Sequence, residues 1–188
     1  MPAGTNACSK SESKRMFVNW PSGGVSWKGV GILKQPVDLF LQHQIIWHTK
    51  PDVLVELGTW QGGSAVWYAE TGVRVVTVDI QDQVKTRHPD VTYLLGSSSD
   101  PEIIRQVRNF STGRVMVVLD SAHDYQTVRG ELDVYADLVS RGCYLIVEDT
   151  AMEGPAKALR EWRDGHPEFR ADATITATEH PGGYLVRR

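Results

Sequence analysis

Short apolar runs alternate with helix-like stretches along most of this chain. Five runs have the length and composition of buried strands: Val53–Leu57, Val73–Val78, Val91–Leu95, Val115–Leu119 and Tyr144–Val147. The stretches beside them carry apolar residues with the character of helices: Pro36–Lys50, Ser64–Glu70, Pro101–Phe110, Tyr125–Ser140 and Pro155–Asp164. This alternation predicts βαβ units and a parallel sheet.

The C-terminal part of the chain predicts a different strand pairing. Ala173–Thr178 and Tyr184–Arg187 have the composition of strands, and a Pro181-Gly182-Gly183 turn lies between them. A tight connection of this kind joins antiparallel strands. The predicted fold class is therefore α/β, with helices on both faces of a mostly parallel seven-stranded sheet that ends in an antiparallel hairpin. This is the Rossmann-like order of the class I methyltransferases.

The N-terminal part has no regular apolar period. Residues 1–15 are rich in Ser, Lys and small residues and predict a flexible tail, which leaves residues 16–188 as a single domain. Residues 16–35 mix aromatic side chains with glycines. Such a segment folds over the edge of the core or over the mouth of a site. A lid and an arm that contacts a second copy of the chain, in a homo-oligomer, are both open alternatives.

Composition narrows the classes of partner. The formal net charge is -3 and no basic face is evident, so we expect no nucleic-acid partner. The chain contains no apolar run of about 20 residues, the length needed to cross a bilayer. We therefore expect no membrane partner. The N-terminus lacks the apolar core of a signal peptide, and we expect a cytoplasmic protein.

Carboxylates follow two neighbouring apolar runs. Asp120 comes directly after one run, and Glu148 and Asp149 come directly after the other. Ligands of open α/β sheets bind beyond the carboxyl ends of the strands, where three carboxylates would repel one another without a cation. Oxygen ligands suit Mg²⁺, Mn²⁺ or Ca²⁺. The alternative is structural: Asp120 as a helix cap or turn residue, and Glu148-Asp149 as a solvated loop.

A glycine loop follows the first predicted strand. The spacing from Glu56 to Ser64 differs from the dinucleotide fingerprint, but Glu-x-Gly-x-x-x-Gly is the first motif of methyltransferases. The carboxylate of the methionine moiety would meet the amides near Gly62–Ser64, and Glu56 would receive its ammonium group. Asp79 ends the second strand, where it is placed to accept the ribose hydroxyls. The predicted cofactor-binding residues are Glu56, Gly58, Thr59, Trp60, Gly62, Gly63, Ser64, Asp79, Ser97 and Asp120.

With these residues in view, the chain resembles the cephalosporin-hydroxylase-like family of class I O-methyltransferases, which is related to macrolide-sugar and rhamnosyl O-methyltransferases. The matching segments are Trp27 to Val30, Lys50 to Asp52, Glu56 to Ser64, Leu119 to His123, Tyr144 to Thr150 and Pro181 to Leu185. The resemblance implies S-adenosylmethionine and Mg²⁺ (or Mn²⁺ or Ca²⁺) as cofactors. It also implies that Asp120, Glu148 and Asp149 ligate the metal and that His123 is the general base. Ala122 departs from the acidic residue of many relatives.

These features predict an O-methyltransferase that acts on a hydroxyl of a small molecule, such as a sugar or a natural product with a vicinal diol. A hydroxyl group is a poor nucleophile, and a metal with a nearby histidine overcomes this. Two alternatives stay open. One is a cofactor-binding accessory protein without catalysis. The other is an oxidoreductase or hydroxylase, which the glycine spacing and the absence of a two-histidine-one-carboxylate set disfavour.

Overall fold

The computed structural model describes residues 25–188. The helices are α2 (Pro36–Thr49), α3 (Gly63–Ala69), α4 (Pro101–Phe110), α5 (Tyr125–Tyr135), the 3-10 helix η1 (Ala136–Leu138) and α6 (Glu153–Arg163). The strands are β1 (Val25–Trp27), β2 (Val30–Ile32), β3 (Val53–Leu57), β4 (Arg74–Asp79), β5 (Val91–Leu95), β6 (Val115–Leu119), β7 (Tyr144–Val147), β8 (Phe169–Ala171) and β9 (Tyr184–Arg187). Within residues 25–188, every helix is too short or too polar to cross a membrane.

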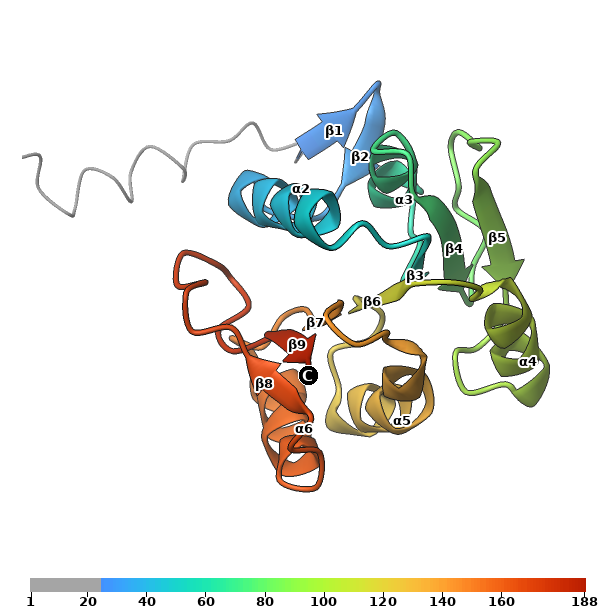
Figure 1. Ribbon diagram of the computed structural model, residues 1–188. Helices are drawn as coiled ribbons and strands as arrows, with labels where there is room; N and C mark the ends of the chain where they lie inside the picture. The colour runs from blue at the N-terminus through green and yellow to red at the C-terminus, as the bar shows by residue number, and fades with distance from the viewer. Residues whose placement is uncertain (1–24) are drawn as a thin grey trace, which may run out of the picture.

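Seven strands form one sheet in the order β5-β4-β3-β6-β7-β9-β8. The strands from β5 to β7 run parallel, whereas β9 is antiparallel to both of its neighbours. Figure 1 shows α2 and α3 on one face of this sheet and α4, α5 and α6 on the other. The predicted fold class, a mostly parallel sheet with an antiparallel C-terminal pair, is confirmed.

The central strands are mostly apolar because both of their faces are covered, with Glu56 of β3 and Thr77 of β4 as buried polar exceptions. Alternate residues of a strand point to opposite faces. Val55 therefore packs in one core with Leu132 of α5 and Trp162 of α6. Its neighbour Leu54 packs in the other core with Tyr68 of α3. Because these strands run parallel, the carboxyl ends of β3, β4, β6 and β7 lie along one edge of the sheet.

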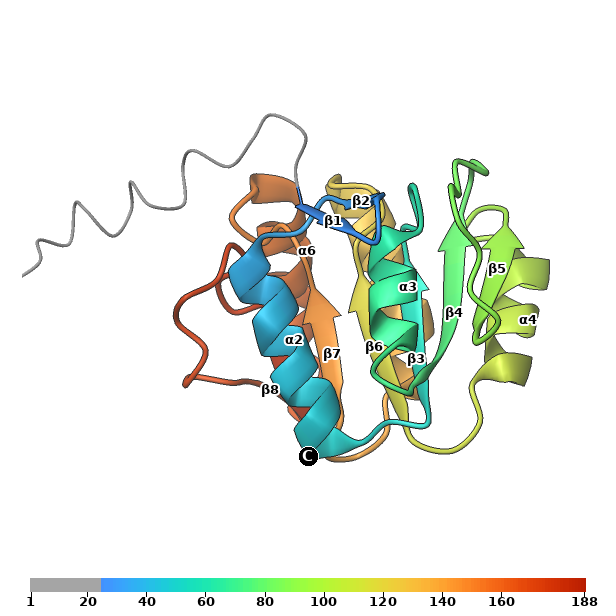
Figure 2. The ribbon, with the colours of Figure 1, turned by 90° about the horizontal axis from the view of Figure 1, so that it is seen from above.

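The short β1–β2 hairpin lies at this same edge (Figure 2). Its β2 strand passes so close to the start of α3 that a Cβ atom on Gly63 would lie 2.2 Å from the carbonyl oxygen of Gly31. Trp27 donates a hydrogen bond from its indole to Glu70, just after α3. The predicted tail and residues 16–24 of the predicted lid or arm lie outside the described residues, so these two interpretations stay predictions.

One predicted strand is wrong. The eighth strand comprises Phe169–Ala171, and the predicted strand Ala173–Thr178 has no place in the sheet. Asp172 explains the difference. Its N–H donates to the carbonyl of Tyr184 at the end of the ladder, and its carboxylate then accepts from the N–H and hydroxyl of Thr174. These bonds form a turn, which ends the strand.

Candidate functional site

A cavity of about 610 Å³ lies at the carboxyl ends of β3, β4 and β6. Its wall includes the loops after these strands and the segment that follows β2. Such an edge of an open α/β sheet is the usual ligand site of this architecture. The predicted site residues on the wall are Gly58, Thr59, Trp60, Ser64, Asp79, Ser97, Asp120, His123 and Asp149. Ile32, Leu33 and Lys34 line it too, and we did not predict them.

Three predicted cofactor-binding residues lie beside the cavity and do not line it. Gly62 is the N-cap residue of helix α3, and Gly63 is its first residue. Glu56 is fully buried in β3, where one carboxylate oxygen accepts from the hydroxyl of Thr77 at 2.8 Å. The other oxygen, Oε1, has no partner among the described residues. Burial raises the pKa of Glu56, although the charge of Lys34 opposes this shift.

Asp79 holds the glycine loop from the end of β4. Its Oδ2 atom accepts hydrogen bonds from the N–H groups of Thr59 at 3.0 Å and Trp60 at 2.8 Å. Its Oδ1 atom accepts from the N–H of Gln81 at 3.0 Å. The structure therefore gives Asp79 a positioning role, and ribose binding by this carboxylate stays a prediction.

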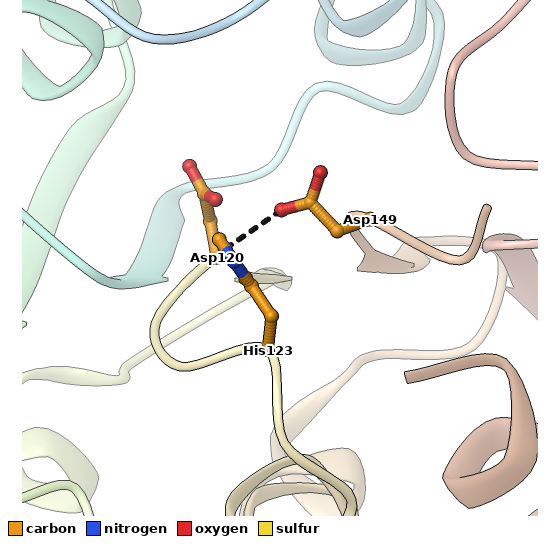
Figure 3. Close-up of side chains that lie close together, drawn as sticks. All are labelled: Asp120, His123 and Asp149. Atoms are coloured by element: carbon orange, nitrogen blue, oxygen red, sulfur yellow. Dashed lines mark ion pairs between the residues drawn. The ribbon is translucent and has the colours of Figure 1, made fainter. Parts of the chain in front are cut away.

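Asp120, His123 and Asp149 form a group that has the composition of a metal site. One ligand atom from each residue lies within 4.8 Å of the others. Figure 3 shows the three side chains converging, with His123 Nε2 2.8 Å from Asp149 Oδ2. They meet because β6 and β7 are adjacent parallel strands, so the loops after them leave the sheet side by side.

Asp149 has an unusual backbone that the sequence did not indicate. Its φ is 54°, in the left-handed region, where residues other than glycine are uncommon. Its N–H donates to Nδ1 of His180 at 2.7 Å. His180 is buried, and its Nε2 atom lies 3.5 Å from Glu148 Oε2 and 3.8 Å from Asp38 Oδ2. A residue from the loop before β9 therefore holds the backbone of Asp149.

Glu148 lies apart from this group. Its side chain is only 2% exposed, and Oε1 accepts from Lys34 Nζ at 2.7 Å and from Gln42 Nε2 at 2.8 Å. Consecutive residues project in different directions, and here Asp149 faces the cavity whereas Glu148 faces the core. Burial opposes ionisation of Glu148, but Lys34 and His180 hold its pKa below the usual value. Its role as a metal ligand stays a prediction, because Lys34 occupies its carboxylate.

Lys34 is a residue of the site that our sequence reasoning missed. Its ammonium also lies 2.5 Å from Asp120 Oδ2. Burial alone would lower its pKa, but Asp120 and Glu148 raise it well above the usual value, so Lys34 carries its charge. The sequence offers no local signal for these pairs, since the partners lie 86 and 114 residues away.

A family model for rhamnosyl O-methyltransferase/CmcI matches residues 21–188. The rhamnosyl O-methyltransferase of Mycobacterium tuberculosis (strain H37Rv) is 30% identical to this chain in an alignment 204 positions long. The alignment covers 91% of this chain and 83% of that protein. The chain belongs to this family. The resemblance stated above and the predicted enzyme class, an S-adenosylmethionine-dependent O-methyltransferase, are thereby confirmed.

Solved structures share the fold of this O-methyltransferase. A structure of CmcI with magnesium and S-adenosylmethionine has a TM-score of 0.68 and 22% identity, covering 87% of this chain and 76% of CmcI. A structure of MycE, from the mycinamycin biosynthetic pathway, has a TM-score of 0.52 and 19% identity, covering 65% of this chain and 37% of MycE. At these identities the likeness supports the class I fold.

In this O-methyltransferase, Glu131 of α5 ties two loops of the site together. Its Oε1 atom accepts from the hydroxyl of Ser98 at 2.7 Å and from that of Ser121 at 2.6 Å. Ser98 follows β5 and Ser121 follows β6, and both line the cavity. The second oxygen, Oε2, has no partner among the described residues. Burial raises the pKa of Glu131, and the two serine hydroxyls oppose this shift.

Replacing Glu131 with glutamine is expected to stabilise the protein at pH 7 by about 1 kcal/mol, because a neutral amide avoids the cost of a buried charge. Since the pKa of Glu131 is higher in the folded state, wild-type stability falls as pH rises from about 4 through that pKa. The gain should therefore be largest at neutral pH and vanish near pH 4. Urea unfolding at several pH values measures it, with Asp133→Asn, an exposed change on α5, as the control.

Proposed function

We propose that this O-methyltransferase uses a divalent metal ion to methylate a hydroxyl group of a small molecule, such as a sugar or a hydroxylated natural product. The observation that carries the proposal is the convergence of Asp120, His123 and Asp149 on the wall of the cavity beside the glycine loop. A base, two carboxylates and room for a cofactor are the groups that this reaction needs.

The cavity fits S-adenosylmethionine by the chemistry of its surroundings. The unpartnered Oε1 atom of buried Glu56 is suited to the ammonium group of the cofactor, received directly or through water. Asp79 and Ser97 offer polar groups at the ends of the next two strands. The cavity volume of about 610 Å³ lies within the range of cofactor sites.

The donor set also fits a hard divalent ion. Asp120 and Asp149 supply carboxylate oxygens, the preferred ligands of Mg²⁺, with Mn²⁺ or Ca²⁺ as alternatives. Glu148 would join them only if Lys34 released its carboxylate. A bound ion would supply positive charge that lowers the pKa of the acceptor hydroxyl. A structure of the methyltransferase MycE holds magnesium together with S-adenosylhomocysteine and mycinamycin VI, which supports the same use of a metal here.

His123 performs the proton transfer in this proposal. A ring nitrogen takes the proton of the acceptor hydroxyl as the oxygen attacks the methyl carbon. S-adenosylmethionine, when bound, would supply the methyl group, and its sulfur would keep the electron pair of the carbon–sulfur bond. The carboxylate of Asp149, 2.8 Å from His123, stabilises the imidazolium that results. The walls of the cavity align acceptor and donor for in-line displacement.

The acceptor class follows from the relatives and from the mouth of the cavity. The curated relatives are rhamnosyl O-methyltransferases, and sugars offer neighbouring hydroxyls that bind one ion together. Leu33 is 73% exposed on the wall of the cavity and gives an acceptor an apolar contact. We therefore propose a deoxysugar, free or attached to a larger apolar molecule, as the first acceptor class to test.

Calorimetric titration of the full-length protein with S-adenosylhomocysteine and with Mg²⁺ tests the two sites separately. We expect both ligands to bind to the wild type. In Asp149→Asn, Mg²⁺ affinity should fall at least about tenfold, because one charged ligand is lost, and S-adenosylhomocysteine should bind as before. The Asp149→Asn variant should also transfer less methyl to a rhamnoside, measured with labelled S-adenosylmethionine. This loss of activity should parallel the loss of Mg²⁺ affinity.

Asp164→Asn is the matched control, because Asp164 is an exposed aspartate after α6 and lies away from the cavity. It should leave both affinities unchanged. A wild-type protein that binds neither ligand would contradict the proposal. Full methyl transfer in the presence of a strong chelator would contradict the metal's part in it and leave the cofactor site intact.

A further inference from the structure

The ammonium group of Lys34 lies between two predicted metal ligands. Nζ is 2.5 Å from Asp120 Oδ2 and 2.7 Å from Glu148 Oε1, and the side chain is only 1% exposed. A buried cation in contact with two carboxylates provides the charge neutralisation that a metal ion would provide at the same atoms.

We propose that Lys34 is a built-in counter-ion that competes with the divalent metal ion for Asp120 and Glu148. This inference rests on the proposed metal-dependent function. Lys34 contacts two carboxylates that we predict to be metal ligands, and two cations on the same carboxylate repel each other. The metal ion therefore binds at the cost of at least one Lys34 contact.

The two carboxylates differ in their freedom to change partner. Glu148 is also held by Gln42, whose side-chain oxygen accepts from the hydroxyl of buried Tyr68. Asp120 is 21% exposed, lines the cavity, and makes its one side-chain hydrogen bond within residues 25–188 to Lys34. Asp120 is thus the carboxylate that a metal ion binds first. Glu148 holds Lys34 in place before the metal ion binds.

This arrangement explains why a site with three carboxylates is compatible with a folded protein in the absence of metal. Lys34 offsets part of the repulsion between Asp120 and Glu148. The same contact weakens metal binding, because the ion has to displace an existing positive charge. Lys34 therefore sets the metal concentration at which the site fills.

Mn²⁺ binding to the full-length protein, followed by the electron paramagnetic resonance signal of the free ion, tests the inference. Lys34→Met should bind Mn²⁺ at least about tenfold more tightly than the wild type, because the competing charge is gone. Lys34→Arg keeps the charge and should bind Mn²⁺ close to the wild-type affinity. Lys28→Met is the matched control, since Lys28 lies in the turn of the hairpin that precedes Lys34 but pairs with Glu70 at the surface.

The outcomes separate this inference from the proposed function. If Lys34→Met binds Mn²⁺ with unchanged or lower affinity while the wild type binds it well, the metal site stands and competition by Lys34 is rejected. If neither protein binds Mn²⁺, the proposed metal dependence fails and the inference fails with it. Tighter binding in Lys34→Met, absent from Lys28→Met, supports both.

A second measurement uses the wild type alone, in case Lys34→Met does not fold. Buried ammonium protons exchange slowly, so Lys34 should give a resolved side-chain signal in a protein labelled with ¹⁵N-lysine. Titration with Mg²⁺ should shift this signal in step with metal binding. A signal that stays unchanged at saturating Mg²⁺ would show that Lys34 keeps both contacts, which overturns the inference.

Discussion

Replacing His123 with glutamine is expected to lower kcat for methyl transfer by about 10²- to 10⁴-fold, the usual contribution of a general base. The side chain of His123 is 47% exposed, so the substitution should leave the fold intact. Binding of S-adenosylhomocysteine should be unchanged, because His123 is not part of the predicted cofactor set. Steady-state kinetics with a rhamnoside acceptor and calorimetry on the same preparation measure the two effects.

A second histidine provides the control for this experiment. His48 is exposed in the last turn of α2, away from the cavity, and His48→Gln should keep wild-type kcat. A His123→Gln enzyme with more than about a tenth of wild-type kcat would contradict the role of general base. Proton transfer would then have to be assigned to another group or to water.

Replacing Gly58 with alanine is expected to lower the free energy of unfolding by about 2–5 kcal/mol. Gly58 has a φ of 103°, and a Cβ atom there would lie 1.8 Å from the carbonyl oxygen of Asp120. The obstacle is backbone, so relief requires the loops after β3 and β6 to separate. Urea unfolding measures the loss, and S-adenosylhomocysteine binding should fall with it because both loops line the cavity.

Gly72 separates the two causes of this loss. It also has a positive φ, 92°, but a Cβ atom there would have no neighbour within 4 Å. Gly72→Ala should therefore show only the backbone cost, about 1–2 kcal/mol, with unchanged ligand binding. Equal stability of the two variants would show that the loops separate freely, against the close approach of Gly58 and Asp120.

Much of the architecture followed from local patterns. A parallel strand that is buried on both faces has to be apolar, so β3 and β6 have the bounds predicted from their sequences. The prediction of a late strand at Ala173–Thr178 was wrong because a local turn competes with the sheet for the backbone of this segment. Thr174 and Ile175 have strand-like composition, but the carboxylate of Asp172 accepts from the backbone N–H of Thr174, a donor that a strand would use in the sheet.

The site shows the same division. The sequence by itself determined that Asp120 and Asp149 follow buried strands and that a glycine loop follows β3, because these features depend on short-range alternation of apolar and polar residues. The role of this loop in cofactor binding stays a prediction. Only the tertiary structure decided that Asp149 faces the cavity while Glu148 faces the core, and that Lys34 lies between Glu148 and Asp120. The direction of a side chain depends on partners such as His180 and Gln42, which lie far away in the sequence. Electrostatic contacts of this kind form when separate elements pack, so no local pattern of residues encodes them.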